Sequence, residues 1–374
     1  MRWVAAIASA ALLAGPAHAE NVALIGSGVW RGTIGKLPVV ACFQEGSWTT
    51  GSYYYLSSKR PIRLTRDDNG QWNEQPGGDG KVTGTWQIGR NGAQLVGEWS
   101  DGGKRLPISL DQLPDGKDEN QGCASEAFMA PRDGPVTVTR RPANRTAAPH
   151  TIISYRPPDW FSGVEIASFA LPVERPGDRK INARFELAPT APAVIGYREC
   201  FQGSLMMGGT DGEYTQIYEA AEIGPMFVRA LDRSSGYCGG AHPYWGYSWM
   251  NFDRQTGLPI VIDRWFARQA VRKQNYPSTD GASLNPGPAL LRAIMRRYRQ
   301  DQKEDGDECR TSLAEQATWS VGVSAKGLIF TPELPHVMQA CSDDLLVPYS
   351  ELAPHLSVEG KAAIARLGLG KARR

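Results

Sequence analysis

The sequence lacks long hydrophobic runs and a strong charge of either sign. No segment approaches the roughly 18 apolar residues that a membrane-spanning helix needs, so we expect no transmembrane anchor. The 41 basic and 39 acidic residues nearly balance, which gives no electrostatic reason to expect nucleic acid as a partner. Histidine is also scarce, with five in the chain.

Local catalytic and cofactor signatures are absent as well. The chain has no Gly-x-Ser-x-Gly elbow, His-Glu-x-x-His pair, phosphate loop or dinucleotide fingerprint. These absences disfavour hydrolase, kinase and oxidoreductase functions, and we expect no cofactor. A glycan hydrolase that uses two carboxylates has no local signature and stays an alternative.

The first 19 residues have the features of a secretory signal peptide. Arg2 supplies the positive start, Val4 to Leu13 the short apolar core, and Ala17-His18-Ala19 a small-x-small cleavage site. Its removal leaves about 355 residues, enough for two domains with their own cores. We therefore expect a periplasmic or secreted protein.

Six cysteines follow the predicted leader, an even number that indicates three disulfides in an oxidising compartment. A domain boundary between the second and third would force the first pair. For the other four we prefer the pairing of sequence neighbours, which gives Cys42–Cys123, Cys200–Cys238 and Cys309–Cys341. A zinc site at Cys238 and His242 is the rival interpretation, but no further ligand stands at suitable spacing, and we expect no metal.

Residues 20–130 read as an all-β domain of short strands and turns. Strand candidates cover 39–43, 51–56, 62–64, 85–88, 95–99 and 106–110, and Asn91-Gly92 is a strong hairpin signal. This spacing is typical of a small antiparallel barrel or sandwich. Five tryptophans allow a carbohydrate-stacking platform, but we favour core packing, above all for Trp86 and Trp99; the five are Trp30, Trp48, Trp72, Trp86 and Trp99.

Residues 131–150 contain four prolines and little apolar periodicity, which predicts an extended linker. Residues 151–374 mix strands and helices, so we expect an α+β domain with a mixed or antiparallel sheet and two or three helices. The expected helices cover about 263–273, 288–302 and a last one capped by Ser357. The expected strands cover 151–155, 164–171, 214–221, 227–231, 247–252, 319–323, 328–330 and 345–348.

The most informative stretch is Tyr237 to Gly257. The double glycine Gly239-Gly240 lets the backbone bend, and an aromatic run follows it. Tyr and Trp give large, rigid contact area with a polar handle. We therefore predict a partner-binding loop made of His242, Pro243, Tyr244, Trp245 and Tyr247.

Two alternatives exist for this stretch. If it forms a strand, Tyr247 and Trp249 share one face and pack inside the protein. A general-base role for His242 would need Ser248 or Asp253 close by, which the sequence cannot place. Catalysis is the less favoured interpretation.

Three pieces in order carry a resemblance to a known family. They are 239–243, then 251–257 with 262–266, and then 327–330 with 347–352. Together they resemble the exported RsiV-type domain, over about 151–357, which is found in lysozyme-sensing anti-sigma factors and beside peptidoglycan deacetylase domains. The resemblance implies recognition outside the cytoplasm, with lysozyme as the best-known partner. The chain departs from both contexts, because it lacks a cytoplasmic segment with a membrane span and lacks a deacetylase domain.

The sequence thus predicts a non-catalytic binding protein of the bacterial envelope, with lysozyme or a peptidoglycan-type glycan as hypothesised partner. The alternatives are a carboxylate-dependent glycan hydrolase and a structural envelope protein without a specific ligand. Facing carboxylates in a cleft would favour the hydrolase, and an exposed aromatic surface would favour the binding protein.

Overall fold

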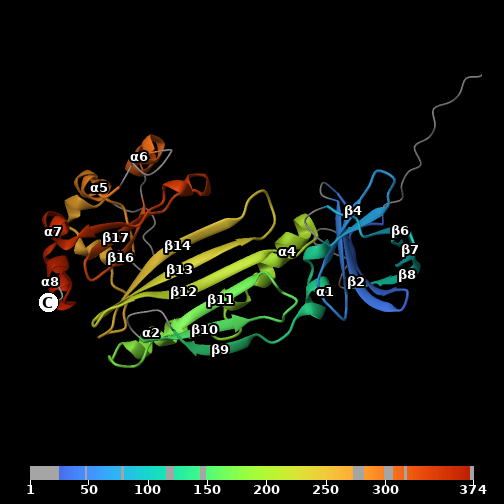
Figure 1. Ribbon diagram of the computed structural model, residues 1–374, viewed down its shortest axis with the longest axis horizontal. Helices are drawn as coiled ribbons and strands as arrows, with labels where there is room; N and C mark the ends of the chain where they lie inside the picture. Colours follow the sequence, from blue (N-terminus) through green and yellow to red (C-terminus); the bar gives the residue numbers. More distant parts are fainter. Residues whose placement is uncertain are drawn as a thin grey trace, which may run out of the picture.

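The computed structural model describes residues 25–46, 49–76, 80–114, 122–143, 149–272, 282–298, 306–315 and 318–370. The predicted leader and Trp48 lie outside these ranges. Three sheets follow one another along the molecule: a barrel, a six-stranded sheet and a four-stranded sheet (Figure 1). Within the described ranges, no helix is both long enough and apolar enough to cross a membrane.

The N-terminal region is a closed barrel in which each strand pairs antiparallel with the next and β8 closes onto β1. This confirms the barrel rather than the sandwich. Its strands are β1 (Gly28–Ile34), β2 (Leu37–Gln44), β3 (Thr50–Tyr55), β4 (Ile62–Arg66), β5 (Trp72–Gln75), β6 (Gly84–Asn91), β7 (Gln94–Ser100) and β8 (Arg105–Gln112). The predicted Asn91-Gly92 hairpin joins β6 to β7.

Aromatic side chains fill the barrel, because alternate residues of each strand point inward. Trp30, Trp72 and Trp86 are fully or almost fully buried there, and Trp99 packs against them. Trp99 Nε1 also donates to the buried carboxylate of Glu74 at 2.9 Å. These four rings serve the core, as favoured from the sequence, and not a sugar platform.

A six-stranded mixed sheet follows, in the order β14-β13-β12-β11-β10-β9. Its strands are β9 (Thr137–Pro142), β10 (Thr151–Arg156), β11 (Val164–Ala170), β12 (Glu213–Ile223), β13 (Phe227–Tyr237) and β14 (Tyr244–Asp253). β11 and β12 pair parallel, which requires a long crossover. The crossover contains α2 (Asp178–Phe185), α3 (Pro192–Ile195) and α4 (Tyr197–Gly208).

The expected linker over 131–150 is wrong in its middle, because Thr137–Pro142 forms β9 and pairs with β10. β9 is an edge strand with every residue exposed. Pro142 stands at its end, where a missing N–H interrupts no ladder. The low apolar content that suggested a linker reflects this exposure.

The barrel and the six-stranded sheet share a core. The outward-facing Tyr54 of β3 packs in one cluster with Ile153 of β10 and Phe201 of α4. The short helix α1 (Glu126–Met129) lies between them and contributes Phe128, whose carbonyl accepts from Tyr54 Oη at 2.9 Å.

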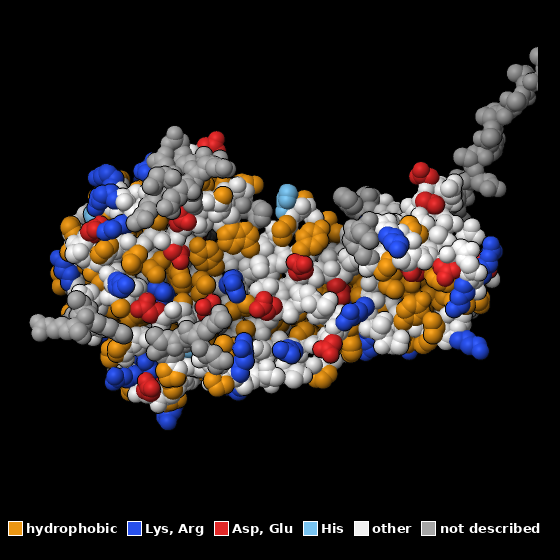
Figure 2. All heavy atoms as spheres, viewed as in Figure 1, with side chains coloured by type: hydrophobic (Ala, Val, Ile, Leu, Met, Phe, Trp, Pro, Cys, Tyr) orange, Lys and Arg blue, Asp and Glu red, His pale blue; other side chains and the backbone are white. Residues whose placement is uncertain are grey.

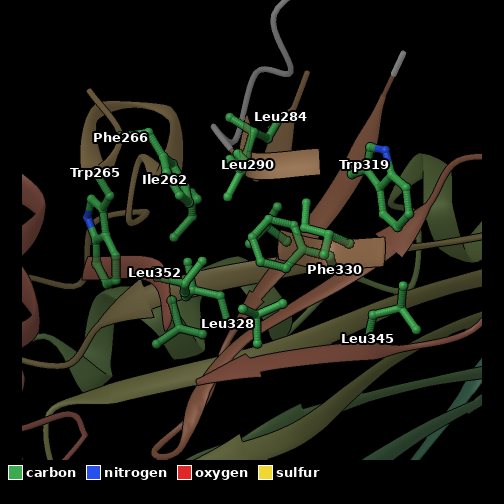
Figure 3. Close-up of a cluster of buried hydrophobic side chains, with 14 of the residues drawn as sticks. Ile262, Trp265, Phe266, Leu284, Leu290, Trp319, Leu328, Phe330, Leu345 and Leu352 are labelled. Atoms are coloured by element: carbon green, nitrogen blue, oxygen red, sulfur yellow. The ribbon is translucent and has the colours of Figure 1, made fainter. Parts of the chain in front are cut away.

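The C-terminal region is a four-stranded antiparallel sheet with surrounding helices. It contains β15 (Ser283–Leu284), β16 (Trp319–Val323), β17 (Gly327–Pro332), β18 (Leu345–Pro348), α5 (Pro288–Met295), α6 (Gly306–Glu315), α7 (Tyr349–Leu352) and α8 (Val358–Arg366). Trp319, Leu328 and Phe330 of the sheet meet Leu290 of α5 and Leu352 of α7 in one buried cluster (Figure 3). The predicted hairpin 319–330 and the Ser357 cap, whose Oγ accepts from Gly360 N, are confirmed.

The helix expected over 263–273 is wrong. Two 3-10 turns, Ile262–Trp265 and Arg268–Ala270, occupy this stretch. Phe266 between them bridges to Leu356 in the last part of the chain, and tertiary contact of this kind overrides helix propensity. The helix expected over 288–302 ends as α5 at Met295, and 299–302 lie outside the described residues.

The turn 253–257 has a structural role, because it holds the end of β14 against α2. Asp253 Oδ1 accepts from the backbone of Gln255, and Gly257 adopts φ +70°, which favours glycine. Arg254 reaches from this turn to Asp178 at the start of α2, with two N–O distances of 2.8 Å. This part of the motif that resembles the RsiV-type domain therefore connects α2 to the end of β14 through the Asp178–Arg254 ion pair.

The three disulfides are Cys42–Cys123, Cys200–Cys238 and Cys309–Cys341, the pairing preferred from the sequence. They support an oxidising location outside the cytoplasm. Cys200–Cys238 ties α4 to the end of β13, beside the loop that leads into β14.

Replacing both Cys309 and Cys341 with alanine is expected to lower the free energy of unfolding by about 2–4 kcal/mol, mainly through a less restricted unfolded chain. Urea denaturation of the oxidised proteins measures the difference. An unchanged midpoint and slope would show that this bond does not restrict the unfolded state.

Candidate functional site

The two faces of the six-stranded sheet differ in what covers them. On one face, Ile153 and Ile166 pack under α4, and Val228 and Met250 pack with α2 residues. On the other face the four-stranded sheet covers the end of β14, where Asn251 Nδ2 donates to Val321 O at 2.7 Å. The 3-10 helix His336–Cys341 also reaches this second face beside Trp245 and Tyr247, and we call this side of the sheet the open face.

Strand alternation divides the predicted aromatic loop between the two faces. Trp245 and Tyr247 pair with Ser235 and Arg233 and point to the open face, together with Trp249. Tyr244 points to the opposite face. The five residues therefore do not form one continuous loop, because β14 begins at Tyr244 and its pleat sends neighbouring rings to opposite faces.

The loop before β14 bends as the double glycine predicts. Gly239 and Gly240 have φ of +89° and +93°. A Cβ at Gly239 would stand 2.7 Å from the carbonyl oxygen of Gly203 in α4, so only glycine fits this approach. His242 and Pro243 lie exposed at the tip of this loop.

Tyr244 is 39% exposed and lies near Tyr214 on the α4 face. Burial, with a smaller contribution from Tyr244, raises the pKa of Tyr214 to about 12. Both hydroxyls therefore stay protonated at neutral pH. Tyr244 is available to a partner from that side of the sheet, away from Trp245.

Trp245 and Tyr247 form the wall of a surface cleft. Their rings are nearly parallel, with centroids 6.0 Å apart and an interplanar angle of 15°. The cleft has a volume of about 450 Å³. The remaining wall comes from Gly246, from Pro332 at the end of β17, and from Glu333, Leu334, Pro335 and Gln339 in the segment that follows. We call it the aromatic cleft, and Figure 2 shows hydrophobic side chains gathered where β14 meets the C-terminal sheet.

Polar groups at the aromatic cleft can receive a hydroxyl-bearing ligand. Gln339 Oε1 is buried and accepts no hydrogen bond, while its Nε2 donates to Leu334 O at 2.7 Å. A buried acceptor without a partner is uncommon in proteins, but Trp30 Nε1 and Trp86 Nε1 in the barrel core are also buried without a partner, so this state does not by itself mark a ligand site. Burial raises the pKa of Tyr247, whose hydroxyl lies 3.2 Å from Ser342 Oγ and stays protonated.

Trp249 is part of the core and not of the cleft. It is 5% exposed, its Nε1 donates to Thr331 Oγ1 at 2.9 Å, and Arg229 lies over its ring. For this residue the interior packing considered from the sequence is confirmed. Tyr247 is half-buried and serves both the packing and the cleft wall.

A second cleft opens on the same face where β11 and β12 separate, and we call it the β11–β12 cleft. Its volume is about 420 Å³. Buried Ile217, Ala220 and Phe169 contribute apolar surface, and charged residues stand exposed around it. The full lining is Arg141, Ala143, His150, Ile152, Glu165, Ala167, Ser168, Phe169, Ile217, Tyr218, Glu219, Ala220 and Arg233.

Register shows that the two clefts are neighbours. Arg233, which lines the β11–β12 cleft, is the direct cross-strand partner of Tyr247, which lines the aromatic cleft. Directly opposed side chains on one face have Cβ atoms about 5 Å apart. An elongated ligand on the open face can therefore reach both clefts.

The arrangement gives no support to a general-base role for His242 with Ser248 or Asp253, the less favoured interpretation of the sequence. Asp253 lies at the far end of β14, about 30 Å from Tyr244 at the strand rise, and its carboxylate is held in the turn and by Arg366. Ser248 points to the face opposite Trp245.

Two carboxylates do line the β11–β12 cleft, which bears on the hydrolase alternative. Glu165 stands opposite Thr215, four residues before Glu219 on β12. Their backbone positions are thus about 13 Å apart along the sheet, beyond the range of roughly 5–9.5 Å between the catalytic carboxyls of glycosidases. The register does not favour paired carboxylate catalysis.

Metal ligation is not supported at Cys238, because this residue is bonded to Cys200. Within the part of the chain that the structure describes, no group of three or more His, Cys, Asp or Glu residues is placed to hold an ion.

The sequence analysis did not identify Gln339, Arg233 or the second cleft. The alternation of residues from Trp245 to Trp249 could have predicted that Trp245, Tyr247 and Trp249 share one face of a strand. The hairpin at Gly239-Gly240 further indicates that β13 residues share that face. Gln339 could not be found in this way, because it reaches the cleft from a different sheet.

No family model matches the sequence, and no curated protein matches it significantly. Solved structures similar to the chain include a DUF3298 family protein from Pseudomonas aeruginosa PAO1, with 12% identity and a TM-score of 0.34 over 61% of this chain and 97% of that one. Another is a DUF3298 family member from Bacteroides fragilis, with 12% identity and a TM-score of 0.40 over 65% of this chain and 100% of that one. Neither assigns an activity.

Proposed function

We propose that the protein is a non-catalytic binding protein of the bacterial envelope, periplasmic or secreted, which holds a peptidoglycan-type glycan in the aromatic cleft. The observation that carries the proposal is the pair of nearly parallel rings, Trp245 and Tyr247, in an open cleft of about 450 Å³. Flat aromatic surfaces match the apolar face of a sugar ring, and their polar edges accept or donate hydrogen bonds.

The remaining groups of the cleft suit the same ligand. The Tyr247 hydroxyl, 3.2 Å from Ser342 Oγ, can exchange hydrogen bonds with a sugar hydroxyl, and a few polar groups beside aromatic walls are typical of small-ligand sites. The three disulfides support a location where envelope glycans are found. The RsiV-type resemblance, which includes domains beside peptidoglycan deacetylases, agrees with this proposal.

Replacing Trp245 with alanine is expected to reduce binding of purified peptidoglycan about tenfold, which corresponds to about 1.4 kcal/mol. The reason is the loss of one half of the ring pair, while the strand and its hydrogen bonds remain. Sedimentation of the mature protein with insoluble peptidoglycan, over a range of glycan concentrations, measures the effect.

Tyr244→Ala is the matched control, because Tyr244 is on the same strand but points to the opposite face. It is expected to bind peptidoglycan as the wild type does. Equal binding by wild type and Trp245→Ala would contradict the proposal. Parallel pull-downs with lysozyme test the other partner: lysozyme binding lost in Tyr244→Ala and kept in Trp245→Ala would place recognition on the exposed loop and reject the glycan cleft.

A further inference from the structure

The β11–β12 cleft exists because two parallel strands separate. β11 pairs with β12 from Val164 to Ala167, but it continues to pair with β10 as far as Ala170. β12 likewise continues beside β13 to Ile223. Beyond Ala167 the facing edges of β11 and β12 form no ladder with each other, and they become the two walls of a wedge.

The wedge is closed from the α2 side. The ring of Phe185 in α2 stacks on the ring of Phe169, with centroids 4.4 Å apart. Its centroid lies 5.6 Å from that of the Tyr218 ring. The Phe185 carbonyl accepts a hydrogen bond of 2.5 Å from Ser168 Oγ. The cleft therefore opens toward the open face, where the aromatic cleft also lies.

Backbone groups along the wedge are partly satisfied already, because the N–H and C=O of Leu171, just after β11, are hydrogen-bonded to the Asn182 side chain of α2. A register shift near Ala220 adds a β-bulge to the β12 wall. Bulges occur often beside binding sites, where they interrupt pairing. A peptide in this cleft would therefore meet mainly side chains.

The charged groups specify the peptide further. Arg141 of β9 and Arg233 of β13 stand on two sides of the cleft, and Glu165 and Glu219 lie between them. All four are exposed, and none forms an ion pair with another described residue. Two carboxylates repel a polyanion such as a polyphosphate, whereas the mixed set complements a ligand that carries both carboxylate and ammonium groups.

We propose that the β11–β12 cleft binds the peptide arm of the same polymer whose sugar chain lies in the aromatic cleft. The two subsites are adjacent, because Arg233 of one is the cross-strand partner of Tyr247 of the other. The arm lies extended between β11 and β12, with its carboxylates toward Arg141 and Arg233 and its amine toward Glu165 or Glu219. This inference rests on the proposed glycan-binding function and narrows its ligand to a glycan that carries peptides.

Calorimetric titration with three soluble probes tests the inference. The first is a peptide-free oligomer of N-acetylglucosamine and N-acetylmuramic acid. The second is the same oligomer with stem peptides that have a free amine and free carboxylates. The third carries those peptides with the amine acetylated and the carboxylates amidated. We expect the second probe to bind at least tenfold more tightly than the other two.

The variant Arg141→Glu/Arg233→Glu is expected to bind the peptide-free oligomer as the wild type does, and to lose the tenfold advantage of the charged peptide. Arg175→Glu/Arg179→Glu is the matched control, because these exposed arginines lie at the start of α2. It should keep the advantage. Matching circular dichroism and thermal midpoints establish that both variants fold.

The outcomes separate the two proposals. If the wild type binds all three probes equally, the peptide subsite is wrong and the glycan function stands. If no probe binds, the glycan function itself is wrong. Retention of the peptide advantage in Arg141→Glu/Arg233→Glu also overturns the assignment of this cleft.

Discussion

Asp178→Ala is expected to lower the free energy of unfolding by about 3–5 kcal/mol, because it leaves the buried guanidinium of Arg254 without its partner. Asp178 is fully buried and Arg254 is 4% exposed. The two side chains form a bidentate pair, and Arg254 Nη1 also donates to Gly224 O at 3.0 Å. Chemical denaturation of the purified variant measures the loss.

A neighbouring carboxylate supplies the control. Glu174 also lies near Arg254, at 3.6 Å, but its side chain is 60% exposed. Exposed ion pairs contribute about 0–1 kcal/mol, so Glu174→Ala should change stability little. Equal effects of the two substitutions would show that burial of the Asp178–Arg254 pair is not what stabilises this turn.

The Asp178–Arg254 pair also makes the stability of the fold depend on pH. Burial by itself raises the pKa of Asp178, but hydrogen bonds from Arg254 and from the amides of Arg175 and Glu174 outweigh it, and the net pKa is lowered. A depressed carboxyl pKa stabilises the fold above the unfolded value of about 3.9, and this stabilisation is lost as pH falls through the folded value. Stability of Asp178→Asn should therefore fall less steeply below pH 4 than that of the wild type. Parallel acid-unfolding curves would contradict this.

Arg132→Met is expected to lower the free energy of unfolding by about 3–5 kcal/mol, because it leaves the half-buried Asp211 carboxylate unpaired between the barrel and the six-stranded sheet. The Arg132 side chain is fully buried. It contacts Asp211 Oδ1 at 2.8 Å and Oδ2 at 2.5 Å, and its Nε donates to Lys59 O at 2.9 Å. Its guanidinium also lies 4.6 Å from the ring centroid of Phe161.

Two further variants test this account by urea denaturation. Arg132→Met/Asp211→Leu should recover much of the loss, since an apolar pair of similar volume often replaces a buried ion pair without penalty. Arg198→Ala removes a partly exposed cation that joins Glu126 and Asp133 near the same interface, and it should cost about 1 kcal/mol or less. If Arg198→Ala costs as much as Arg132→Met, the interface does not depend on the buried pair.

The strands and hairpins of the N-terminal region were readable from the sequence because their rules are local, whereas the choice between barrel and sandwich stayed open because closure pairs β1 with the distant β8. Alternation along each strand and the Asn91-Gly92 turn fix short antiparallel hairpins, which need no information from distant residues. The β16–β17 hairpin and the Ser357 cap were readable for the same reason. The domain boundary fixed only the Cys42–Cys123 pair, and the pairing of sequence neighbours among the other four cysteines was a preference that the structure confirms.

The crossover between β11 and β12 was not readable in this way. α2 and α4 lie in a stretch for which the sequence gave no helix prediction, and parallel pairing joins residues about 50 positions apart (Val164 with Tyr214). At 263–273 the opposite occurred: the sequence predicted a helix that the structure does not contain. Contact with Leu356 holds this segment in two short turns.

For the candidate site, the sequence by itself determined that rings gather after Gly239-Gly240, because a flexible bend followed by aromatic residues is a property of adjacent positions. Tertiary structure decided which rings can act together. The pleat of β14 sends Tyr244 to the α4 face and Trp245 with Tyr247 to the open face. Packing of the C-terminal sheet then buries Trp249 and brings Gln339 to the cleft, and such contacts between distant segments arise only when the chain is folded.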